Sequence, residues 1–246
     1  MNYREKIEHL VSLVKISNKT LVLTGAGAST ESGIPDFRSQ KKGLWQKYNP
    51  EEVASLNALK RDPAKFYQLN MQWWRRCIEA QPNATHYGLA QLEKMGWLLG
   101  VITQNIDGLH QRAGSKRVWE VHGHLRTCRC FKCGRGYAFS QLESGYICHC
   151  GGVLRPDVVL FGDAMPKDYA TAEKVMSGCQ LLLVVGSSLQ VYPVANLPQF
   201  ARRLVIINHD PTPWDDRADL VLRESSGQVL GDVLANLDDE QGPIPW

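Results

Sequence analysis

No apolar run in the sequence is long enough to cross a bilayer. The longest runs are short, such as Leu181 to Val185, whereas a membrane-spanning helix needs about 20 apolar residues. The first residues, Met1 to Lys6, mix charged and polar side chains, which is not the pattern of a secretory signal peptide. We therefore expect a cytoplasmic protein without a membrane partner.

A strong excess of charge is also missing. The 28 Lys and Arg residues outnumber the 25 Asp and Glu residues by 3, and the pI is about 8.4. Nucleic-acid-binding domains usually carry a clustered basic face and a higher pI, so we expect no direct nucleic-acid partner. The 246 residues, 43% of them hydrophobic, suit one large domain that carries a smaller insert.

Cysteines are scarce outside one segment. Five of the seven lie between Cys128 and Cys150. Cys77 and Cys179 stand apart, and we expect both to be buried as small apolar side chains. In a cytoplasmic chain, a cluster of cysteines indicates a metal site rather than disulfides.

The cluster has a spacing that suits zinc. A C-x-x-C pair is followed, after fourteen residues, by a tighter C-x-C pair. Four thiolates bind one tetrahedral zinc ion and leave no open position for water, so this metal is expected to be structural. The expected ligands are Cys130, Cys133, Cys148 and Cys150. Cys128 or His149 is the alternative to Cys148.

Short apolar runs bounded by Gly, Asn or Asp predict buried parallel strands. These runs cover residues 21–24, 98–103, 118–122, 181–186, 204–208 and 220–222. Helical patterns between them cover residues 4–16, 63–79, 86–95, 166–177 and 193–201. The alternation predicts an α/β fold with a doubly wound, mostly parallel, Rossmann-like sheet.

Two regions interrupt the alternation. Residues 39–81 are helical and rich in aromatic side chains, and residues 125–154 hold the cysteine cluster. We expect this helical insert and this zinc-binding module to form a small domain together. Residues 1–38, 82–124 and 155–246 then form the sheet domain.

A glycine-rich turn follows the first predicted strand. Gly25 and Gly27 would let the main chain approach a pyrophosphate. The dinucleotide-binding fingerprint is incomplete, because Thr30 stands where a third glycine is expected and no acidic residue follows about twenty positions later. Taken alone, the pattern is more typical of a plain tight turn than of a nucleotide site. The loop after Gly33 adds a carboxylate, an aromatic ring and a guanidinium, at Asp36, Phe37 and Arg38, which together could hold a sugar, a flat ring and a phosphate.

Polar residues follow two further predicted strands. Gln104, Asn105 and Asp107 come after the second strand, where open α/β sheets bind ligands. The alternative is a capped turn with Asp107 at the start of a helix. His122 ends the third strand, and a neutral imidazole with a pKa near 6.5 suits a general base. Its alternatives are a histidine satisfied by local hydrogen bonds and a metal ligand. His86, His110 and the other histidines have no comparable argument.

These motifs, taken together, resemble the sirtuin family. The string from Gly25 to Arg38, GAGASTESGIPDFR, looks like the first signature of that family. Five further motifs follow in the expected order, and the resemblance covers about residues 4 to 235. They are Thr103 to Asp107, His122-Gly123, Phe161-Gly162-Asp163, Gly186 to Leu189 and Ile206 to Asn208. The compact chain is similar to prokaryotic members.

The resemblance implies an NAD-dependent protein deacetylase. In such enzymes the acetyl oxygen attacks the nicotinamide ribose, nicotinamide leaves, and the acetyl group ends on ADP-ribose as the 2′-O-acetyl ester. The residues that the resemblance makes catalytic are His122 and Asn105. It assigns the dinucleotide to Gly25, Ala26, Gly27, Ser29, Thr30, Asp36, Phe37, Arg38, Gln104, Asn105, Ile106, Asp107, His122, Gly186, Ser187, Ser188 and Asn208. It assigns the peptide, paired as an added strand, to Val159, Leu160, Phe161, Gly162 and Asp163.

Other functions fit parts of the same pattern. They are removal of other acyl groups, mono-ADP-ribosyl transfer, and a non-catalytic role as an NAD sensor or zinc-ribbon adaptor. Sirtuins that remove succinyl groups carry a Tyr-x-x-Arg pair, and the counterpart here is Tyr67 with Asn70. We therefore expect acetyl-lysine proteins as substrates, although Arg75 or Arg76 is an alternative partner for an acidic acyl group. We also expect a monomer.

Overall fold

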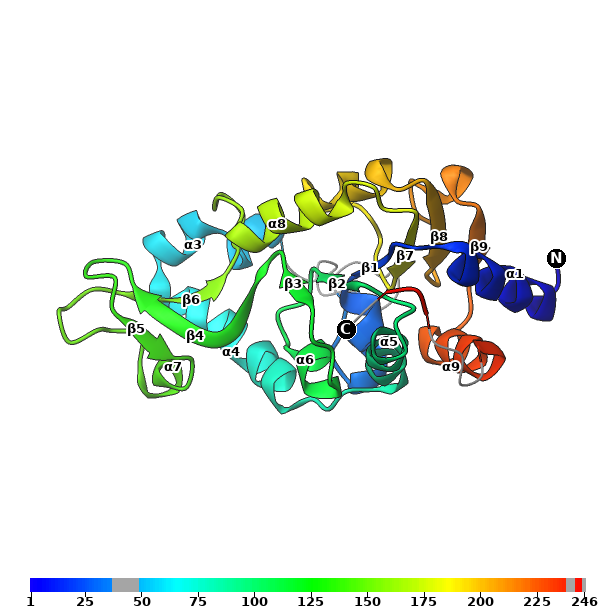
Figure 1. Ribbon diagram of the computed structural model, residues 1–246. Coiled ribbons are helices and arrows are strands. Elements are labelled where there is room, and N and C mark those ends of the chain that lie inside the picture. Colours follow the sequence, from blue (N-terminus) through cyan, green and yellow to red (C-terminus); the bar gives the residue numbers. More distant parts are fainter. Residues whose placement is uncertain (37–48, 238–241, 245–246) are drawn as a thin grey trace.

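A six-stranded parallel sheet forms the larger lobe of the computed structural model, which describes residues 1–36, 49–237 and 242–244 (Figure 1). The strand order is β3-β2-β1-β7-β8-β9, and every neighbouring pair is parallel. The strands are β1 (Thr20–Thr24), β2 (Gly100–Thr103), β3 (Val118–Glu120), β7 (Leu181–Val185), β8 (Arg203–Ile207) and β9 (Leu220–Leu222). The predicted doubly wound, Rossmann-like sheet is confirmed.

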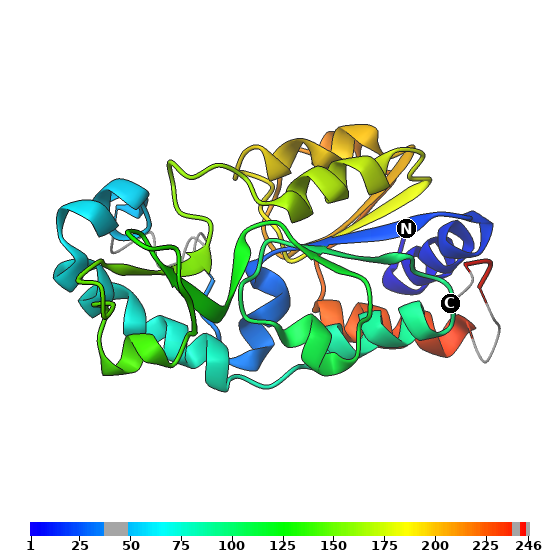
Figure 2. The same ribbon diagram turned by 60° about the vertical axis from the view of Figure 1, so that its left-hand side comes forward.

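Both faces of this sheet are covered by helices, because side chains alternate between the faces along each strand. Leu181, Leu183 and Val185 pack against α1 (Tyr3–Ile16), α5 (Ala84–Lys94) and α9 (Ser226–Leu237). Leu182 and Val184 pack on the other side, against α8 (Lys167–Met176) and the 3₁₀ helix η3 (Val194–Phe200). Figure 2 shows these two helical layers below and above the strands. No helix in residues 1–36, 49–237 and 242–244 is long and apolar enough to cross a membrane.

The smaller lobe is built from two separate stretches of chain. A three-stranded antiparallel sheet has the order β5 (Gly136–Ala138), β4 (Gly123–Cys130) and β6 (Leu154–Val158). The helices α2 (Pro50–Val53), α3 (Leu56–Arg61), α4 (Pro63–Glu79) and α7 (Gln141–Ser144) accompany it. Leu59, Phe66 and Trp74 share one buried cluster with Phe139 and Leu142, so the helical insert and the cysteine segment pack together. Strand β4 of this sheet begins at Gly123, and strand β6 ends at Val158.

The strand order changes direction between β1 and β7, and there two main-chain turns touch. The Gly27 N–H donates to the Gly186 carbonyl at 2.8 Å, and the Gly25 N–H donates to the Val185 carbonyl at 3.1 Å. A Cβ atom on Gly186 would lie 2.2 Å from the Ala28 nitrogen. Ligands in open α/β sheets bind at such a switch point.

This contact predicts that Gly186→Ala is much more disruptive than Gly178→Ala. Both glycines have a left-handed conformation, with φ of 62° and 72°, but a Cβ on Gly178 meets no atom within 4 Å. Gly178→Ala should cost only the conformational term, about 1 kcal/mol of unfolding free energy. Gly186→Ala adds overpacking and should cost about 3 kcal/mol or more. Urea unfolding of both variants measures the difference, and equal losses would contradict the proposed contact.

Candidate active site

The predicted site residues gather at the carboxyl ends of four parallel strands. Residues 25–32 follow β1, where Ala26–Ser32 form the 3₁₀ helix η1 that ends at Gly33. Residues 104–107 follow β2, residues 186–188 follow β7, and Asn208 follows β8. Because neighbouring strands are parallel and in register, these four segments lie along one edge of the sheet. Phe37 and Arg38 lie outside the described residues, whereas Asp36 is described and partly buried.

Gln104 connects the segments that follow β2 and β7. Its Nε2 donates to the Ser187 hydroxyl at 2.8 Å, and its main-chain N–H donates to the Thr24 carbonyl at 3.0 Å. The Ser187 hydroxyl also accepts from the Leu189 N–H at 3.3 Å. Asn208 folds its amide onto its own loop, where Nδ2 donates to the Asp210 carbonyl at 2.7 Å. Ser188 and Asn208 are partly exposed at this edge.

His122 is held as a neutral imidazole with a defined tautomer. Its Nδ1 lies 3.1 Å from the Gln104 carbonyl oxygen. Because a carbonyl oxygen only accepts, Nδ1 carries the proton and Nε2 keeps its lone pair. Burial lowers the pKa of His122 to about 4 against a smaller opposing effect of the Gln104 hydrogen bond. The imidazole is therefore uncharged at neutral pH and can accept a proton at Nε2.

A second network joins Asn105 and Asp107 to the glycine-rich turn. The Ser29 hydroxyl donates to Asp107 Oδ2 at 2.8 Å and accepts from Asn105 Nδ2 at 3.0 Å. Asn105 Nδ2 also lies 3.1 Å from the Gly25 carbonyl, and Asp107 Oδ1 accepts from the Leu109 N–H at 2.9 Å. Asp107 therefore stands at the start of α6 (Leu109–Ala113) and also faces the site.

Asp107 is a buried carboxyl group with an altered affinity for protons. Burial raises its pKa, against hydrogen bonds from the Leu109 N–H and the Ser29 hydroxyl that lower it. No cation partner of Asp107 occurs among the described residues. Ile106, between the two polar side chains, packs against the core of the small lobe, and its carbonyl accepts from the Leu125 N–H at 3.2 Å.

Two histidines without a predicted role extend this network. His86 Nδ1 lies 3.2 Å from the Asn83 main-chain nitrogen and 3.0 Å from Asn83 Oδ1, while His86 Nε2 lies 3.3 Å from the Ser29 hydroxyl. His110 Nε2 lies 2.9 Å from the Thr24 hydroxyl, and the two imidazole rings are 4.9 Å apart. Burial lowers the pKa of His86 to about 4 and that of His110 to about 3. A signal did exist, because His86, Leu89 and Glu93 have the spacing of one buried helix face.

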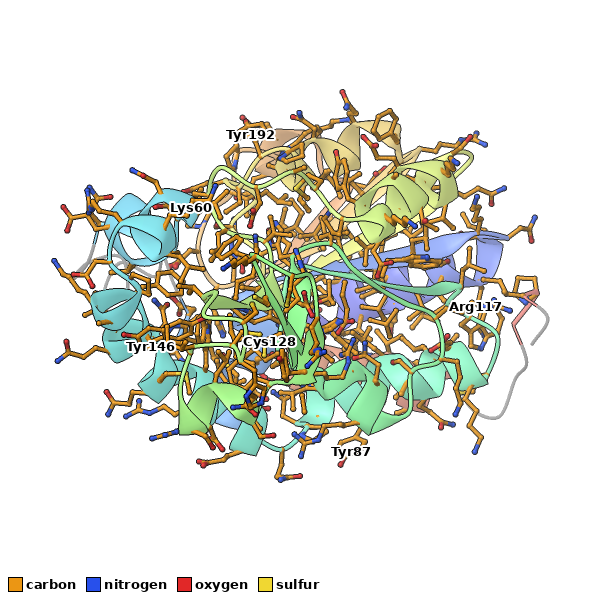
Figure 3. The ribbon with its side chains drawn as sticks, turned by 90° about the vertical axis from the view of Figure 1, so that its left-hand side faces the viewer. Lys60, Tyr87, Arg117, Cys128, Tyr146 and Tyr192 are labelled. Atoms are coloured by element: carbon orange, nitrogen blue, oxygen red, sulfur yellow. The ribbon has the colours of Figure 1, made fainter. Side chains whose placement is uncertain are left out.

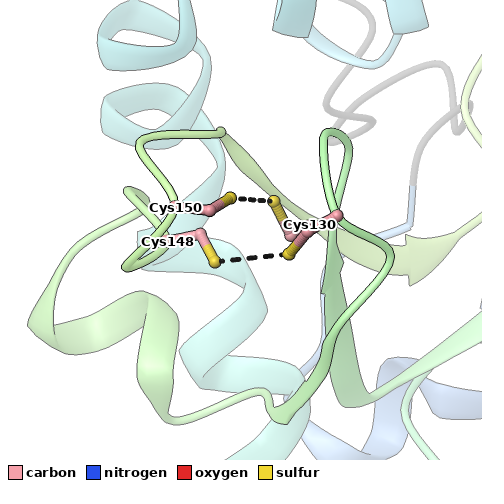
Figure 4. Close-up of side chains that lie close together, drawn as sticks. Cys130, Cys148 and Cys150 are labelled. Carbon is pink, nitrogen blue, oxygen red and sulfur yellow. Dashed lines mark hydrogen bonds between the residues drawn. The ribbon is translucent and has the colours of Figure 1, made fainter.

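Four cysteine sulfurs meet at the far end of the small lobe. The Sγ atoms of Cys130 and Cys150 are 3.5 Å apart, and those of Cys133 and Cys148 are 3.8 Å apart. Figure 4 labels Cys130, Cys148 and Cys150 and marks the two contacts with dashed lines. All four sulfurs lie within 4.8 Å of one another. Zinc–sulfur bonds of about 2.3 Å in a tetrahedron place neighbouring sulfurs about 3.8 Å apart, so the four side chains fit a structural zinc ion.

The two alternative ligands lie outside this sulfur cluster. Cys128, labelled in Figure 3, is fully buried on β4, and its Sγ lies 3.6 Å from the Ala138 carbonyl. Burial raises the pKa of the Cys128 thiol to about 11, which disfavours the thiolate. His149 is exposed and does not belong to the cluster. Cys77 and Cys179 are buried apart from it, as predicted.

Several main-chain groups of the expected peptide loop, residues 159–163, already form hydrogen bonds within the protein. The Val159 N–H donates to the His122 carbonyl at 2.8 Å, and the Phe161 N–H donates to the Ala54 carbonyl at 2.9 Å. Asp163 points inward, toward Arg155, rather than to the surface of the loop. Burial works to raise the pKa of Asp163, but hydrogen bonds from Arg155 and the Leu160 N–H outweigh it and hold the pKa low. Phe161 remains 42% exposed, so its ring can meet a partner.

Comparison with known proteins places these features in a family. Residues 25–193 match the Sir2 family. The chain is 47% identical to NAD-dependent protein deacetylase 2 of Caldanaerobacter subterraneus subsp. tengcongensis, over 95% of this chain and 96% of the relative. It is 44% identical to NAD-dependent protein deacylase 2 of Pyrobaculum aerophilum, over 90% of this chain and 92% of the relative. A solved complex of Sir2 with a p53 peptide and NAD⁺ superimposes with a TM-score of 0.86 at 37% identity, over 94% of this chain and 98% of that one.

The sulfur cluster predicts which cysteine substitutions release zinc. Cys148→Ala removes a member of the tetrahedron and should abolish tight binding of zinc, whereas Cys128→Ala should leave one zinc ion per chain. Elemental analysis of the purified variants measures the zinc content. Loss of zinc from Cys128→Ala, with retention in Cys148→Ala, would show that the ligand set is different.

The buried histidines predict a loss of stability in acid. His86 stays neutral in the fold until the pH nears 4, whereas the unfolded chain protonates it near pH 6.5. Between these limits the unfolded state binds more protons, so the free energy of unfolding falls as the pH falls. For His86 the loss at pH 5 is about 2 kcal/mol.

Urea unfolding at pH 5.0 and pH 7.5 tests this expectation. His86→Gln keeps a hydrogen-bonding amide near Ser29 but does not titrate, so its pH dependence should be smaller than that of the unmodified protein. His9→Gln, on α1 and away from the network, is the matched control and should behave like the unmodified protein. An unchanged pH dependence in His86→Gln would exclude a buried neutral His86 as the cause.

Proposed function

Since the chain belongs to the Sir2 family, we propose that it is an NAD-dependent protein lysine deacetylase. It transfers the acetyl group of acetyl-lysine to ADP-ribose and releases nicotinamide and 2′-O-acetyl-ADP-ribose. The observation that carries this proposal is the geometry of His122. Its Nδ1 proton is bound by the Gln104 carbonyl, which leaves Nε2 as a neutral base beside the glycine-rich strand ends. A non-catalytic NAD sensor has no need of such a base.

The residues present fit the dinucleotide. Gly25, Gly27 and Gly186 approach so closely that a Cβ on any of them would come within 3.0 Å of main chain, and these main-chain turns suit a pyrophosphate. Ser187 and Gln104 add uncharged hydrogen-bonding groups beside them. NAD, when bound, supplies the ribose to which the acetyl group is transferred. The full set of expected dinucleotide residues, Phe37 and Arg38 included, stays a proposal.

We assign the proton transfer to His122 and the positioning to its neighbours. His122 Nε2 takes the proton of a ribose hydroxyl, which makes that oxygen a nucleophile. Asn105 Nδ2 donates to the Gly25 carbonyl and the Ser29 hydroxyl. Its Oδ1 can then accept a hydrogen bond from a ribose hydroxyl or an ordered water. Ile106 and Asp107 receive the nicotinamide amide, and the Ser29 hydroxyl holds the Asp107 carboxyl group in place for it.

Acetyl-lysine is the substrate that the helical insert favours. Asn70, at the place of the arginine in desuccinylases, is buried, and its Nδ2 donates to the carbonyls of Val53 at 2.7 Å and Phe66 at 2.8 Å. Its Oδ1 accepts from the Trp73 indole at 3.1 Å. Asn70 is thus fully engaged within the lobe and offers no charged donor to an acidic acyl group. Arg75 and Arg76 are exposed on the other side of α4.

We further propose a monomer that acts in the cytoplasm on acetyl-lysine proteins, without nucleic acid or a membrane as partner. The small net charge of +3 supports the absence of a nucleic-acid partner. The purified chain is expected to sediment at its monomer mass of 27.6 kDa.

Mass spectrometry of an acetyl-lysine peptide tests the activity. The peptide should lose its acetyl group only when NAD is present, with formation of O-acetyl-ADP-ribose. His122→Ala should lower kcat by about 10²-fold or more, while His124→Ala, two positions away on β4, is the matched control. A succinyl-lysine peptide in the same assay should be turned over at least about 10²-fold more slowly.

Other outcomes of this assay point to other functions. ADP-ribose found on a protein target, without free O-acetyl-ADP-ribose, would indicate mono-ADP-ribosyl transfer. Preferred turnover of succinyl or long-chain acyl peptides would indicate another acyl preference. No turnover of any acyl peptide would contradict the enzyme assignment and favour a non-catalytic role.

A further inference from the structure

A buried ion pair holds the loop that follows β6. The two terminal nitrogens of Arg155 lie 2.8 Å and 2.7 Å from the two carboxylate oxygens of Asp163. The side chains of Arg155 and Asp163 are only 6% and 13% exposed. Bidentate pairs of this kind fix orientation as well as distance.

The same two residues close a turn. Asp163 Oδ2 also accepts from the Leu160 N–H at 2.8 Å, and the Asp163 N–H donates to the Leu160 carbonyl at 2.9 Å. Arg155 Nη2 further donates to the Val158 carbonyl at 2.8 Å. One guanidinium therefore fixes both the start and the end of residues 158–163.

On its other side, the Arg155 guanidinium lies against the turn that carries Cys130 and Cys133. Its guanidinium carbon lies 5.5 Å from the ring centroid of Phe131, within range of a cation–π contact. Phe131 stands between Cys130 and Cys133, and its N–H donates to the Val153 carbonyl at 2.9 Å. The place of this ring thus depends on the geometry of the turn that carries two of the four sulfurs.

The loop also reaches the general base and the helical insert. The hydrogen bond from Val159 to the His122 carbonyl ties the first residue of the loop to the main chain of the base. Phe161 pairs with the strand-like segment before α3, since its carbonyl accepts from the Leu56 N–H at 3.0 Å. A shift of the loop would therefore move both the main chain that is proposed to pair with the peptide and the hydrogen bond to the His122 carbonyl.

From these contacts we propose that Arg155 is a positioning residue. Its guanidinium contacts Phe131 on one side and Asp163 on the other, and it holds residues 159–163 in the conformation that receives the acetyl-lysine peptide. It also links that conformation to the turn that carries Cys130 and Cys133. Asp163 then acts on the peptide through Arg155 and the turn, not by direct contact. This inference rests on the proposed function, which places the peptide at this loop.

Two variants test the link from its two ends. Asp163→Asn removes the charge that Arg155 pairs with, and Phe131→Leu removes the aromatic face but leaves the ion pair intact. Each should raise the KM for an acetyl-lysine peptide about tenfold, with kcat and the affinity for NAD within about twofold. Asp163→Glu, which restores the carboxylate, should recover most of the loss. Asp219→Asn is the matched control, because Asp219 likewise pairs with an arginine and accepts a main-chain N–H, but near β8 and β9.

Hydrogen exchange followed by mass spectrometry tests the same link without turnover. In Phe131→Leu, the amides of residues 158–163 should exchange at least about tenfold faster, although the substitution lies outside that loop and the zinc content stays at one per chain. Unchanged exchange and an unchanged peptide KM in this variant would overturn the proposal. Equal losses of kcat, peptide affinity and NAD affinity in Asp163→Asn and Asp219→Asn would also overturn it, because they indicate general destabilisation. If the unmodified protein shows no deacetylation, the proposed function fails, while exchange and the binding of a labelled acetyl-lysine peptide still decide the role of Arg155.

Discussion

The contact between two main-chain turns at the centre of the sheet sets the geometry of the whole site. Gly27 and Gly186 face each other with no room for a Cβ atom on either, and their hydrogen bond joins the first strand to the seventh. This closeness brings the segments after β1, β2 and β7 to one edge, so that Gln104 can reach Ser187. The Gln104 carbonyl then fixes the tautomer of His122. The tautomer of this imidazole thus depends on a series of short contacts that begins at two glycines.

A second constraint is the burial of the polar groups behind this edge. Ser29, Asn105, His86 and Asp107 form a hydrogen-bonded set in which burial favours neutral histidine and raises the pKa of the carboxyl. Buried polar groups without water must satisfy one another, and they hold their orientation before any ligand arrives. This arrangement makes the free energy of unfolding sensitive to acid, because the unfolded chain binds protons at His86 and His110 more readily than the folded chain does.

Much of the fold could be predicted because its strands are buried on both faces. Leu181 to Val185 is an unbroken apolar run, and such a run between helical segments is typical of a buried parallel strand. The four zinc ligands also followed from sequence spacing, although only the packing of Cys128 against Ala138 removes it from the cluster. The hydrogen-bond partners of His86 and Asp163 could not be predicted from the sequence, although the spacing of His86, Leu89 and Glu93 marks one buried helix face. The partner of each, Ser29 or Arg155, is defined by tertiary packing, and the direction of a side chain in a loop has no periodic signal.

The two lobes differ in how they hold their shape, and the site lies where these two kinds of support meet. The sheet lobe has two continuous apolar layers that stabilise its strands by burial. The small lobe has a single apolar cluster and four sulfurs arranged for a metal ion. Its geometry therefore depends more on individual polar contacts than that of the sheet lobe does. His122 stands at the junction, with its ring bound to the sheet lobe through Gln104 and its carbonyl bound to the small lobe through Val159. An imidazole placed in this way is held by both lobes, so the loop after β6 and the segments at the strand ends act on one and the same residue.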